Sequence, residues 1–211
     1  MYDDTEGETV MKTRRLSTLA LAACLLYCDN TGDAQPLEGS RVEDPALGIA
    51  FNRIGAVEKS DSSTYGMKLQ SLHPARVQVS VGDRLFVDLP GTYGGRLYLD
   101  TPSASRSFQD RVLVDSVNTG GRSFSREYWI VYAGMGMWEG VINCYTEEGG
   151  RYYIVSFIQD VPIGKPGEEV DGKHLDGGAL KERFLTSLRD TTNESIRQFD
   201  ALLGSIQIYN Q

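Results

Sequence analysis

The chain has 211 residues, of which 40% are hydrophobic and 24% are charged, as in an ordinary soluble domain. This composition excludes a disordered chain, a collagen-like repeat and a protein with several membrane-spanning helices. Twenty-nine acidic residues outnumber 21 basic residues, which gives a net charge of −8. The acidic balance argues against binding to nucleic acid or to anionic lipid headgroups, because both require clustered Lys and Arg.

The first recognisable element along the chain is an export signal. The basic segment Lys12-Thr13-Arg14-Arg15 is followed by a mostly apolar run, residues 16–27. This run is shorter than the ~20 residues of a membrane-spanning helix, and it matches the apolar region of a secretory signal peptide. We therefore expect residues 11–34 to be a signal peptide. The acidic residues 1–10 do not fit its start, which indicates that Met11 is the true initiator.

Two processing sites compete within this signal. Leu21-Ala22-Ala23-Cys24 resembles the lipobox of bacterial lipoproteins, in which the cysteine becomes the lipidated first residue. Gly32-Asp33-Ala34 carries small residues at the two positions that a signal peptidase site requires. We favour lipidation of Cys24. Either site predicts a periplasmic protein of a bacterium, and lipidation predicts that it contacts the membrane only through its lipid anchor.

A single domain follows the signal. Residues 29–46 lack hydrophobic periodicity and are interpreted as a linker, so that the domain covers residues 47–211. Short runs of alternating, β-branched and aromatic residues predict strands separated by turn residues. The predicted strands are 48–54, 76–81, 84–89, 96–100, 111–117, 127–133, 141–146 and 151–158. Residues 81–84 and 147–150 are typical of tight hairpin turns, because their glycines tolerate positive φ.

The pattern changes near the C-terminus, after a loop rich in Pro and Gly at 162–172. Apolar residues at helical spacing predict a helix over 180–188. Thr191-Thr192-Asn193-Glu194 fits a capping box for a second helix, which Gly204 ends, and residues 205–209 predict a last strand. We therefore expect an α+β fold, in which an antiparallel, strand-rich sheet carries two C-terminal helices packed on one face.

The sequence offers few residues for metal or nucleophilic chemistry. Its two histidines, His73 and His174, lie in segments with loop composition, and none of H-E-x-x-H, C-x-x-C and G-x-S-x-G occurs. Cys144 lies in a strand pattern and is expected to be a buried small hydrophobe. We therefore expect no metal, no cofactor and no enzymatic activity. The carboxylates to consider for a hydrolase are Glu127 and Glu139, which flank two central strands.

A segment between two predicted strands is a candidate contact loop. Gly134-Met135-Gly136-Met137-Trp138-Glu139-Gly140 does not match a phosphate-binding glycine loop. Met and Trp are adaptable residues with a large contact area, and Trp is enriched at binding hot spots. The candidate protein-contact residues, if the loop is exposed, are Met135, Met137, Trp138 and Glu139. In the alternative arrangement, Trp138 folds back over the sheet edge as part of the core.

The C-terminal half also carries a recognisable layout of elements. An aromatic strand, Tyr128-Trp129-Ile130-Val131-Tyr132, is followed by Gly150-Arg151-Tyr152-Tyr153-Ile154-Val155-Ser156-Phe157 and by a closing Phe199-Asp200-Ala201-Leu202-Leu203-Gly204-Ser205-Ile206. This layout resembles the PsbP-like group of small exported α/β domains, which includes bacterial envelope lipoproteins. The resemblance implies a binding or accessory role, with no shared catalytic residues, and a shared fold does not determine function.

Export, acidity and the missing catalytic set together predict a non-enzymatic protein of the bacterial envelope that binds another protein. An immunity or inhibitor protein would bind a basic secreted toxin, since opposite charges speed such encounters. An accessory assembly lipoprotein would bind an envelope component. The alternative is a periplasmic small-ligand- or lipid-binding domain, which a deep apolar pocket between sheet and helices would favour. A hydrolase is the third reading, and it requires two carboxylates in one cleft.

Overall fold

The described part of the chain comes from a computed structural model. It covers residues 41–69, 75–89, 95–99, 109–134, 137–160 and 177–209. For residues 89, 109–110, 132–134, 137 and 177–180 it includes the backbone alone. The predicted signal peptide with Cys24, the two histidines and most of the predicted linker lie outside these residues.

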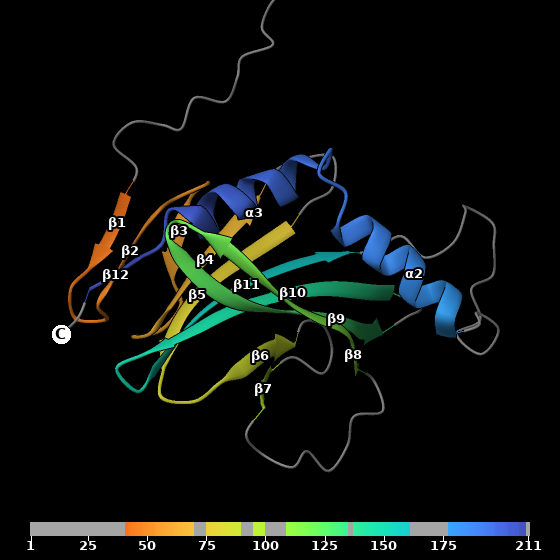
Figure 1. Ribbon diagram of the computed structural model, residues 1–211, viewed down its shortest axis with the longest axis horizontal. Helices are drawn as coiled ribbons and strands as arrows, with labels where there is room; N and C mark the ends of the chain where they lie inside the picture. Colours follow the sequence, from red (N-terminus) through yellow and green to blue (C-terminus); the bar gives the residue numbers. More distant parts are fainter. Residues whose placement is uncertain are drawn as a thin grey trace, which may run out of the picture. The chain divides into compact units, whose positions relative to one another are not determined.

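The largest element is a seven-stranded antiparallel sheet, with strand order β3-β4-β5-β11-β10-β9-β8 (Figure 1). Its strands are β3 (Val57–Lys59), β4 (Thr64–Leu69), β5 (Ala75–Gly82), β8 (Gln109–Thr119), β9 (Arg122–Gly134), β10 (Met137–Glu148) and β11 (Arg151–Asp160). Strands β8 to β11 pair in chain order, as short turns permit. Strand β11 then pairs with β5, which joins the N-terminal and C-terminal halves of the sheet.

Two smaller sheets accompany the large one. Strands β1 (Arg41–Asp44), β2 (Ile49–Asn52) and β12 (Gln207–Ile208) form a three-stranded sheet, and β6 (Phe86–Leu89) and β7 (Gly95–Tyr98) form a two-stranded one. Strand β1 lies inside the segment 29–46 that the sequence predicted to be a linker. Its four residues carry no strand signal of their own, and their order comes from pairing with β2.

One predicted hairpin turn is confirmed and the other is wrong. Gly149 and Gly150 have φ of 63° and 74° and connect β10 directly to β11, as the favoured two-residue hairpin requires. At 81–84 the chain does bend, but β6 pairs with β7 and not with β5. A turn signal in the sequence is local, so it does not state which strands pair across the turn.

A second glycine pair, Gly120 and Gly121, joins β8 to β9 with φ of 58° and 76°. A Cβ atom on Gly120 would lie 2.4 Å from the backbone oxygen of Gly204 at the end of the last helix. Both the positive φ and this close approach therefore require glycine at position 120.

Two helices follow β11, namely α2 (Gly177–Leu188) and α3 (Glu194–Gly204). The predicted capping residue of α3 is wrong by two positions. Asn193, and not Thr191, caps the helix, because the Asn193 side-chain oxygen accepts a hydrogen bond of 3.0 Å from the Ser195 backbone N–H. Asn is as strong an N-cap as Ser and stronger than Thr, so it takes the position. The helix ends at Gly204 as predicted.

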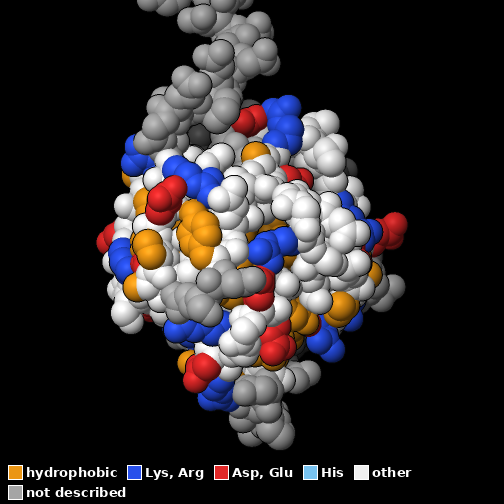
Figure 2. Space-filling view, turned by 60° about the vertical axis from the view of Figure 1, so that its left-hand side comes forward, with side chains coloured by type: hydrophobic (Ala, Val, Ile, Leu, Met, Phe, Trp, Pro, Cys, Tyr) orange, Lys and Arg blue, Asp and Glu red, His pale blue; other side chains and the backbone are white. Residues whose placement is uncertain are grey.

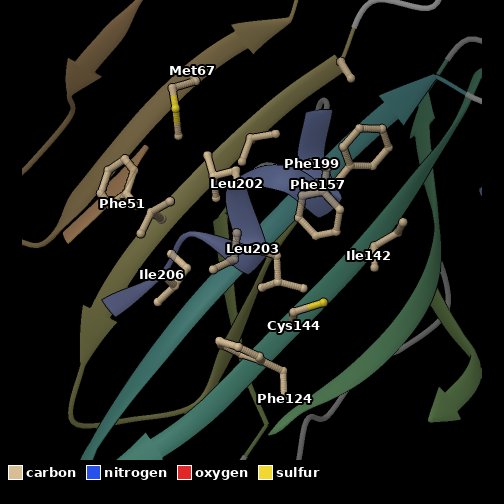
Figure 3. Close-up of a cluster of buried hydrophobic side chains, with 14 of the residues drawn as sticks. Phe51, Met67, Phe124, Ile142, Cys144, Phe157, Phe199, Leu202, Leu203 and Ile206 are labelled. Atoms are coloured by element: carbon tan, nitrogen blue, oxygen red, sulfur yellow. The ribbon is translucent and has the colours of Figure 1, made fainter. Parts of the chain in front are cut away.

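Most buried hydrophobic side chains form one large cluster, which we call the main core (Figure 3). Alternate residues of the sheet enter it, and both helices add side chains such as Phe184 and Phe199. The ring centroids of Phe157 on β11 and Phe199 on α3 are 5.3 Å apart. Cys144 is fully buried here, and burial raises the pKa of its thiol. This confirms the predicted role of Cys144 as a small hydrophobe.

The opposite face of the same strands carries a smaller cluster, which we call the second core. Ile142 and Val141 are neighbours on β10 and point to opposite faces, so Ile142 enters the main core and Val141 the second core. Val87 of β6 is fully buried in the second core, and Leu97 of β7 packs against it. The β6–β7 hairpin therefore covers part of this face. The members of the second core are Val87, Trp129, Val131, Val141 and Ile158.

The predicted α+β class is confirmed in its coarse form, since antiparallel strands dominate and two helices stand at the C-terminal end. Strands β3 and β4 were not predicted. Strand β3 has only three residues, and β4 contains Gly66, a residue type that weakens a strand signal. Their order comes from pairing with each other and with β5.

Candidate functional site

The four residues of the predicted contact loop differ in how much of their structure is described and in how deeply they are buried. Met135 lies outside the described residues, and Met137 is the first residue of β10. Trp138 is half-buried and packs against the main core. Glu139 is only 8% exposed. Trp138 thus contributes to the core, and Glu139 is the residue of this group whose surroundings can be followed in detail.

Glu139 lines a cleft at one end of the large sheet. The cleft has a volume of about 420 Å³, and we call it the Glu139 cleft. It lies where β4 ends, β5 begins and β11 ends, on the face of the sheet that carries the second core. Its lining residues are Lys68, Leu69, Ala75, Arg76, Glu139, Ile158 and Asp160.

The register of the sheet places like charges beside each other in this cleft. Lys68 on β4 is directly opposite Arg76 on β5, and Glu139 on β10 is directly opposite Asp160 on β11. Like charges in directly opposite positions destabilise a sheet. One ion pair crosses from the basic half to the acidic half, with 2.9 Å between Arg76 Nη2 and Glu139 Oε1. Lys68 makes no ion pair with any described residue.

The carboxylate of Glu139 is only half satisfied. Its Oε1 accepts the hydrogen bond from Arg76, whereas its Oε2 is buried and has no hydrogen-bond partner among the described residues. Burial raises the pKa of Glu139, Arg76 opposes this rise, and the neighbouring carboxylate of Asp160 adds to it. A buried acceptor without a donor costs about 1–3 kcal/mol, or more when it is charged. The site is therefore poised either to hold a proton or to receive a donor from outside.

Glu127 is more deeply buried than Glu139, and both of its carboxylate oxygens are satisfied. Its Oε1 accepts a hydrogen bond of 3.1 Å from Arg111, and its Oε2 accepts one of 2.9 Å from the indole N–H of Trp129. It sits opposite Asn143, four positions along β10 from Glu139. At 3.3 Å per residue the two glutamates are about 13 Å apart, which exceeds the spacing of any glycosidase pair. The pair that the sequence singled out therefore does not share one cleft.

Two further unpartnered polar atoms lie on the same side of the sheet as Glu139. Gln78 Oε1 on β5 and Asp88 Oδ2 on β6 are buried, and neither has a hydrogen-bond partner in the part of the chain that the structure describes. Burial raises the pKa of Asp88, although Arg96 lies 3.3 Å from its other oxygen. Neighbours of Gln78 at odd positions on β5, such as Val77, enter the main core, so Gln78 faces away from it. This face therefore concentrates unsatisfied polarity.

The described residues contain no group of three or more His, Cys, Asp and Glu side chains that could hold a metal ion. None of their helices is long and apolar enough to cross a membrane. On the face of the molecule in Figure 2, Lys and Arg side chains lie close to Asp and Glu side chains, and hydrophobic side chains form small separate areas. The surface in this view is thus of mixed charge.

Comparisons with known proteins leave the function open. No family model matches the chain, and no curated protein is similar to it. A solved structure of a protein from Bacteroides thetaiotaomicron VPI-5482 is similar over 83% of this chain, with 9% identity and a TM-score of 0.43. The chain spans 50% of that protein's length. The function therefore has to be inferred from the residues of this chain.

Sequence reasoning found Glu139 but missed its surroundings. Arg76 is the first residue of one predicted strand, and Asp160 lies two residues beyond the end of another. Only the register of β5, β11 and β10 brings them together. The available signal is that Arg76 and Glu139 fall at positions that alternate with core residues on their own strands. That signal indicates that the two residues lie on the same face of the sheet, but it does not show that they lie next to each other.

Proposed function

We propose that this protein is an exported, non-enzymatic binding protein of the bacterial envelope and that it binds a basic protein partner at the Glu139 cleft. The observation that carries the proposal is the unpartnered, buried Oε2 of Glu139 in an open cleft. A Lys ammonium or Arg guanidinium of the partner would donate to this oxygen. Charge-assisted hydrogen bonds of this kind are about twice as strong as neutral ones.

The electrostatics support a cationic group in this position. Asp160 lies opposite Glu139, so two carboxylates share the site, while Arg76 supplies one compensating charge and is itself half exposed. A second cation would relieve the remaining repulsion. The exported part of the chain also remains acidic after removal of the signal, which would speed the approach of a basic partner. An immunity or inhibitor protein against a basic toxin fits this chemistry, and so does an accessory assembly lipoprotein with a basic envelope component as its partner.

The arrangement of the helices belongs to the same proposal. We place α2 and α3 together on the main-core face, and this is supported by Phe184, Leu188 and Phe199, which share one cluster with the sheet. The face with the second core, which the β6–β7 hairpin covers in part, then remains for the partner. The Glu139 cleft opens on that face.

Export and lipidation at Cys24 are retained as part of the proposal, since they rest on the sequence alone. Metabolic labelling with a radioactive fatty acid tests the anchor. We expect label in the wild-type protein and none in Cys24→Ala. Unlabelled wild-type protein cut after Ala34 would refute the anchor and leave export intact.

A small-ligand- or lipid-binding domain is less well supported. Such domains enclose an apolar cavity, and the space between sheet and helices is occupied by fully buried side chains such as Phe51, Phe157 and Leu202. The Glu139 cleft is lined mainly by charged residues. It suits a cationic group better than an acyl chain.

The hydrolase reading gains one specific observation. Glu139 and Asp160 lie opposite each other, and facing residues in a sheet have Cβ atoms about 5 Å apart. Carboxyl groups on neighbouring positions of this kind can come within the roughly 5 Å that separates the two carboxyl groups of retaining glycosidases. However, the cleft residues include no aromatic side chain on which a sugar could stack. Turnover of nitrophenyl glycosides by the wild-type protein, lost in both Glu139→Gln and Asp160→Asn, would favour this reading over binding.

The binding proposal is tested by capture from native envelope extract with three forms of the exported protein. These are the wild type, Glu139→Gln and the control Glu147→Gln, which changes the same residue type at the exposed far end of β10. We expect one basic partner with wild type and control, and at least about tenfold weaker binding of the purified partner to Glu139→Gln. Equal binding by all three forms, or a partner without basic residues at the contact, would refute the proposal.

A further inference from the structure

The outer edge of β8 is long and unpaired in the described structure. The strand runs for 11 residues at the end of the seven-stranded sheet, and no described strand pairs with its second edge. The opposite end of the sheet is the three-residue strand β3. An edge strand presents a row of unpaired N–H and C=O groups that another strand can use. Natural proteins avoid unwanted pairing with short edges or with β-bulges. Strand β8 has one bulge, between Arg111 and Leu113, so the regular stretch from Leu113 to Thr119 is the edge that needs an explanation.

The charged side chains described on β8, Arg111 and Asp115, do not protect this edge. Arg111 points to Glu127, with 3.1 Å between the charged atoms, and Asp115 lies 2.7 Å from Arg126. Asp115 also lies 3.3 Å from Arg189 of α2, so both charges are paired within the chain. Between them, Val114 is 52% exposed, more than any other large hydrophobic residue in the described chain. An apolar residue stands at the centre of the edge, where a charge would be expected to block pairing.

A groove runs between this strand and α2. It has a volume of about 800 Å³. Val112 of β8 and Leu185 of α2 are half-buried in it and pack against the main core. Charged residues border the groove towards both ends of α2. Its lining residues are Val112, Lys181, Glu182, Leu185, Thr186, Ser187, Arg189 and Asp190. A strand added to β8 would lie beside α2 and cover this groove.

We propose that the strand added to β8 is the β8 strand of a second copy, so that two sheets join antiparallel about a two-fold axis. The charges bordering the groove favour this occupant. A two-fold axis through the seam reverses α2, so that Glu182 of one copy approaches Arg189 of the other. Lys181 and Asp190 stand in the same relation. An isologous interface requires this self-complementarity. The seam also brings the two Val114 side chains together and removes them from water.

The oligomeric state of the wild-type protein tests the proposal. Sedimentation velocity is measured from 1 to 200 µM in 0.15 M salt, where screening limits the repulsion between two acidic copies to about 8 Å. We expect a concentration-dependent dimer. Val114→Lys places two ammonium groups at the seam and should raise the dimer Kd by at least about tenfold. Tyr209→Lys changes the other exposed large hydrophobic residue and should leave the dimer intact.

A second variant separates the interface from folding. Glu182→Arg lies on the exposed side of α2 and should weaken the dimer, because it sets a basic residue of one copy against Arg189 of the other. Circular dichroism and thermal unfolding show whether each variant is folded. A wild-type protein that remains monomeric at 200 µM, or a dimer that persists in Val114→Lys, would overturn the proposal. If the wild-type protein is a monomer that binds a strand of a different protein, and Val114→Lys abolishes this binding, self-pairing is overturned and the edge is assigned to that partner.

Discussion

The two faces of the large sheet satisfy their polar groups very differently. On the main-core side, buried polar residues are matched with each other, as when Asn193 donates a hydrogen bond of 3.2 Å to Gln159. On the second-core side, Asn143 and Ser156 are matched as well. Three other residues there, Glu139, Gln78 and Asp88, each keep a buried oxygen without a hydrogen-bond partner among the described residues. The first face is built for stability. The second face contains buried polar atoms without partners. In natural proteins such atoms, and the perturbed pKa values that accompany them, are often found at functional sites.

Two buried carboxylates express this difference as opposite pKa shifts. Asp44 accepts hydrogen bonds from Lys59 at 2.8 Å and from Tyr65 at 2.7 Å, and these lower the pKa of Asp44 to about 2. Burial raises the pKa of Glu139 instead. A carboxylate held by donors contributes stability in its charged form. A buried carboxylate that lacks hydrogen-bond donors lowers the stability of the folded protein when it becomes charged.

The largest expected effect comes from removing a large side chain from the main core. Phe157→Ala deletes a fully buried ring that contacts Phe199, and we expect a loss of about 3–5 kcal/mol in the free energy of unfolding. Val87→Ala in the second core removes two methyl groups, for which we expect about 2 kcal/mol. Urea denaturation measures both. A larger loss for Val87→Ala than for Phe157→Ala would contradict the prediction that the main core contributes more to the free energy of unfolding.

Asp44→Asn tests the satisfied carboxylate. In the wild type, the lowered pKa means that the stability from Asp44 is present above its ordinary pKa of 3.8 and is lost as the pH falls towards about 2. We expect Asp44→Asn to be less stable at pH 6 and to lose less stability between pH 4 and pH 2. Thermal unfolding across this range checks the slope. Parallel curves for the two proteins would show that Asp44 is not held in its charged form.

Glu139→Gln tests the unsatisfied carboxylate. We expect its effect on the free energy of unfolding to be the smallest of the set and opposite in sign to that of Asp44→Asn. Because its pKa is raised, the folded state binds the proton more tightly than the unfolded state, so wild-type stability falls as the pH rises above the ordinary value of 4.5. The stability of Glu139→Gln relative to wild type should therefore increase from pH 4.5 upwards. Urea denaturation at several pH values measures this difference. A difference that decreases with pH would contradict the account.

The sequence predicted those parts of the fold that depend on local pattern. The β10–β11 hairpin was evident from its glycine pair, and α3 from the spacing of Ile196, Phe199 and Leu203. What it missed depends on distant partners. Strand β1 is ordered by β2, and β6 leaves the large sheet to pair with β7. Position 139 was selected as part of a contact loop, but its chemistry comes from Arg76, which is 63 residues away in the chain.

The most direct test of the central claim is a measurement on the carboxylate of Glu139 itself. Its ¹³Cδ NMR signal is followed through a pH titration, first alone and then with Nα-acetyl-lysine methylamide or its glutamate analogue. We predict a pKa above the ordinary glutamate value, lowered by the lysine compound and unchanged by the glutamate compound. An ordinary pKa that neither compound changes would contradict the claim that this cleft lacks a cationic partner.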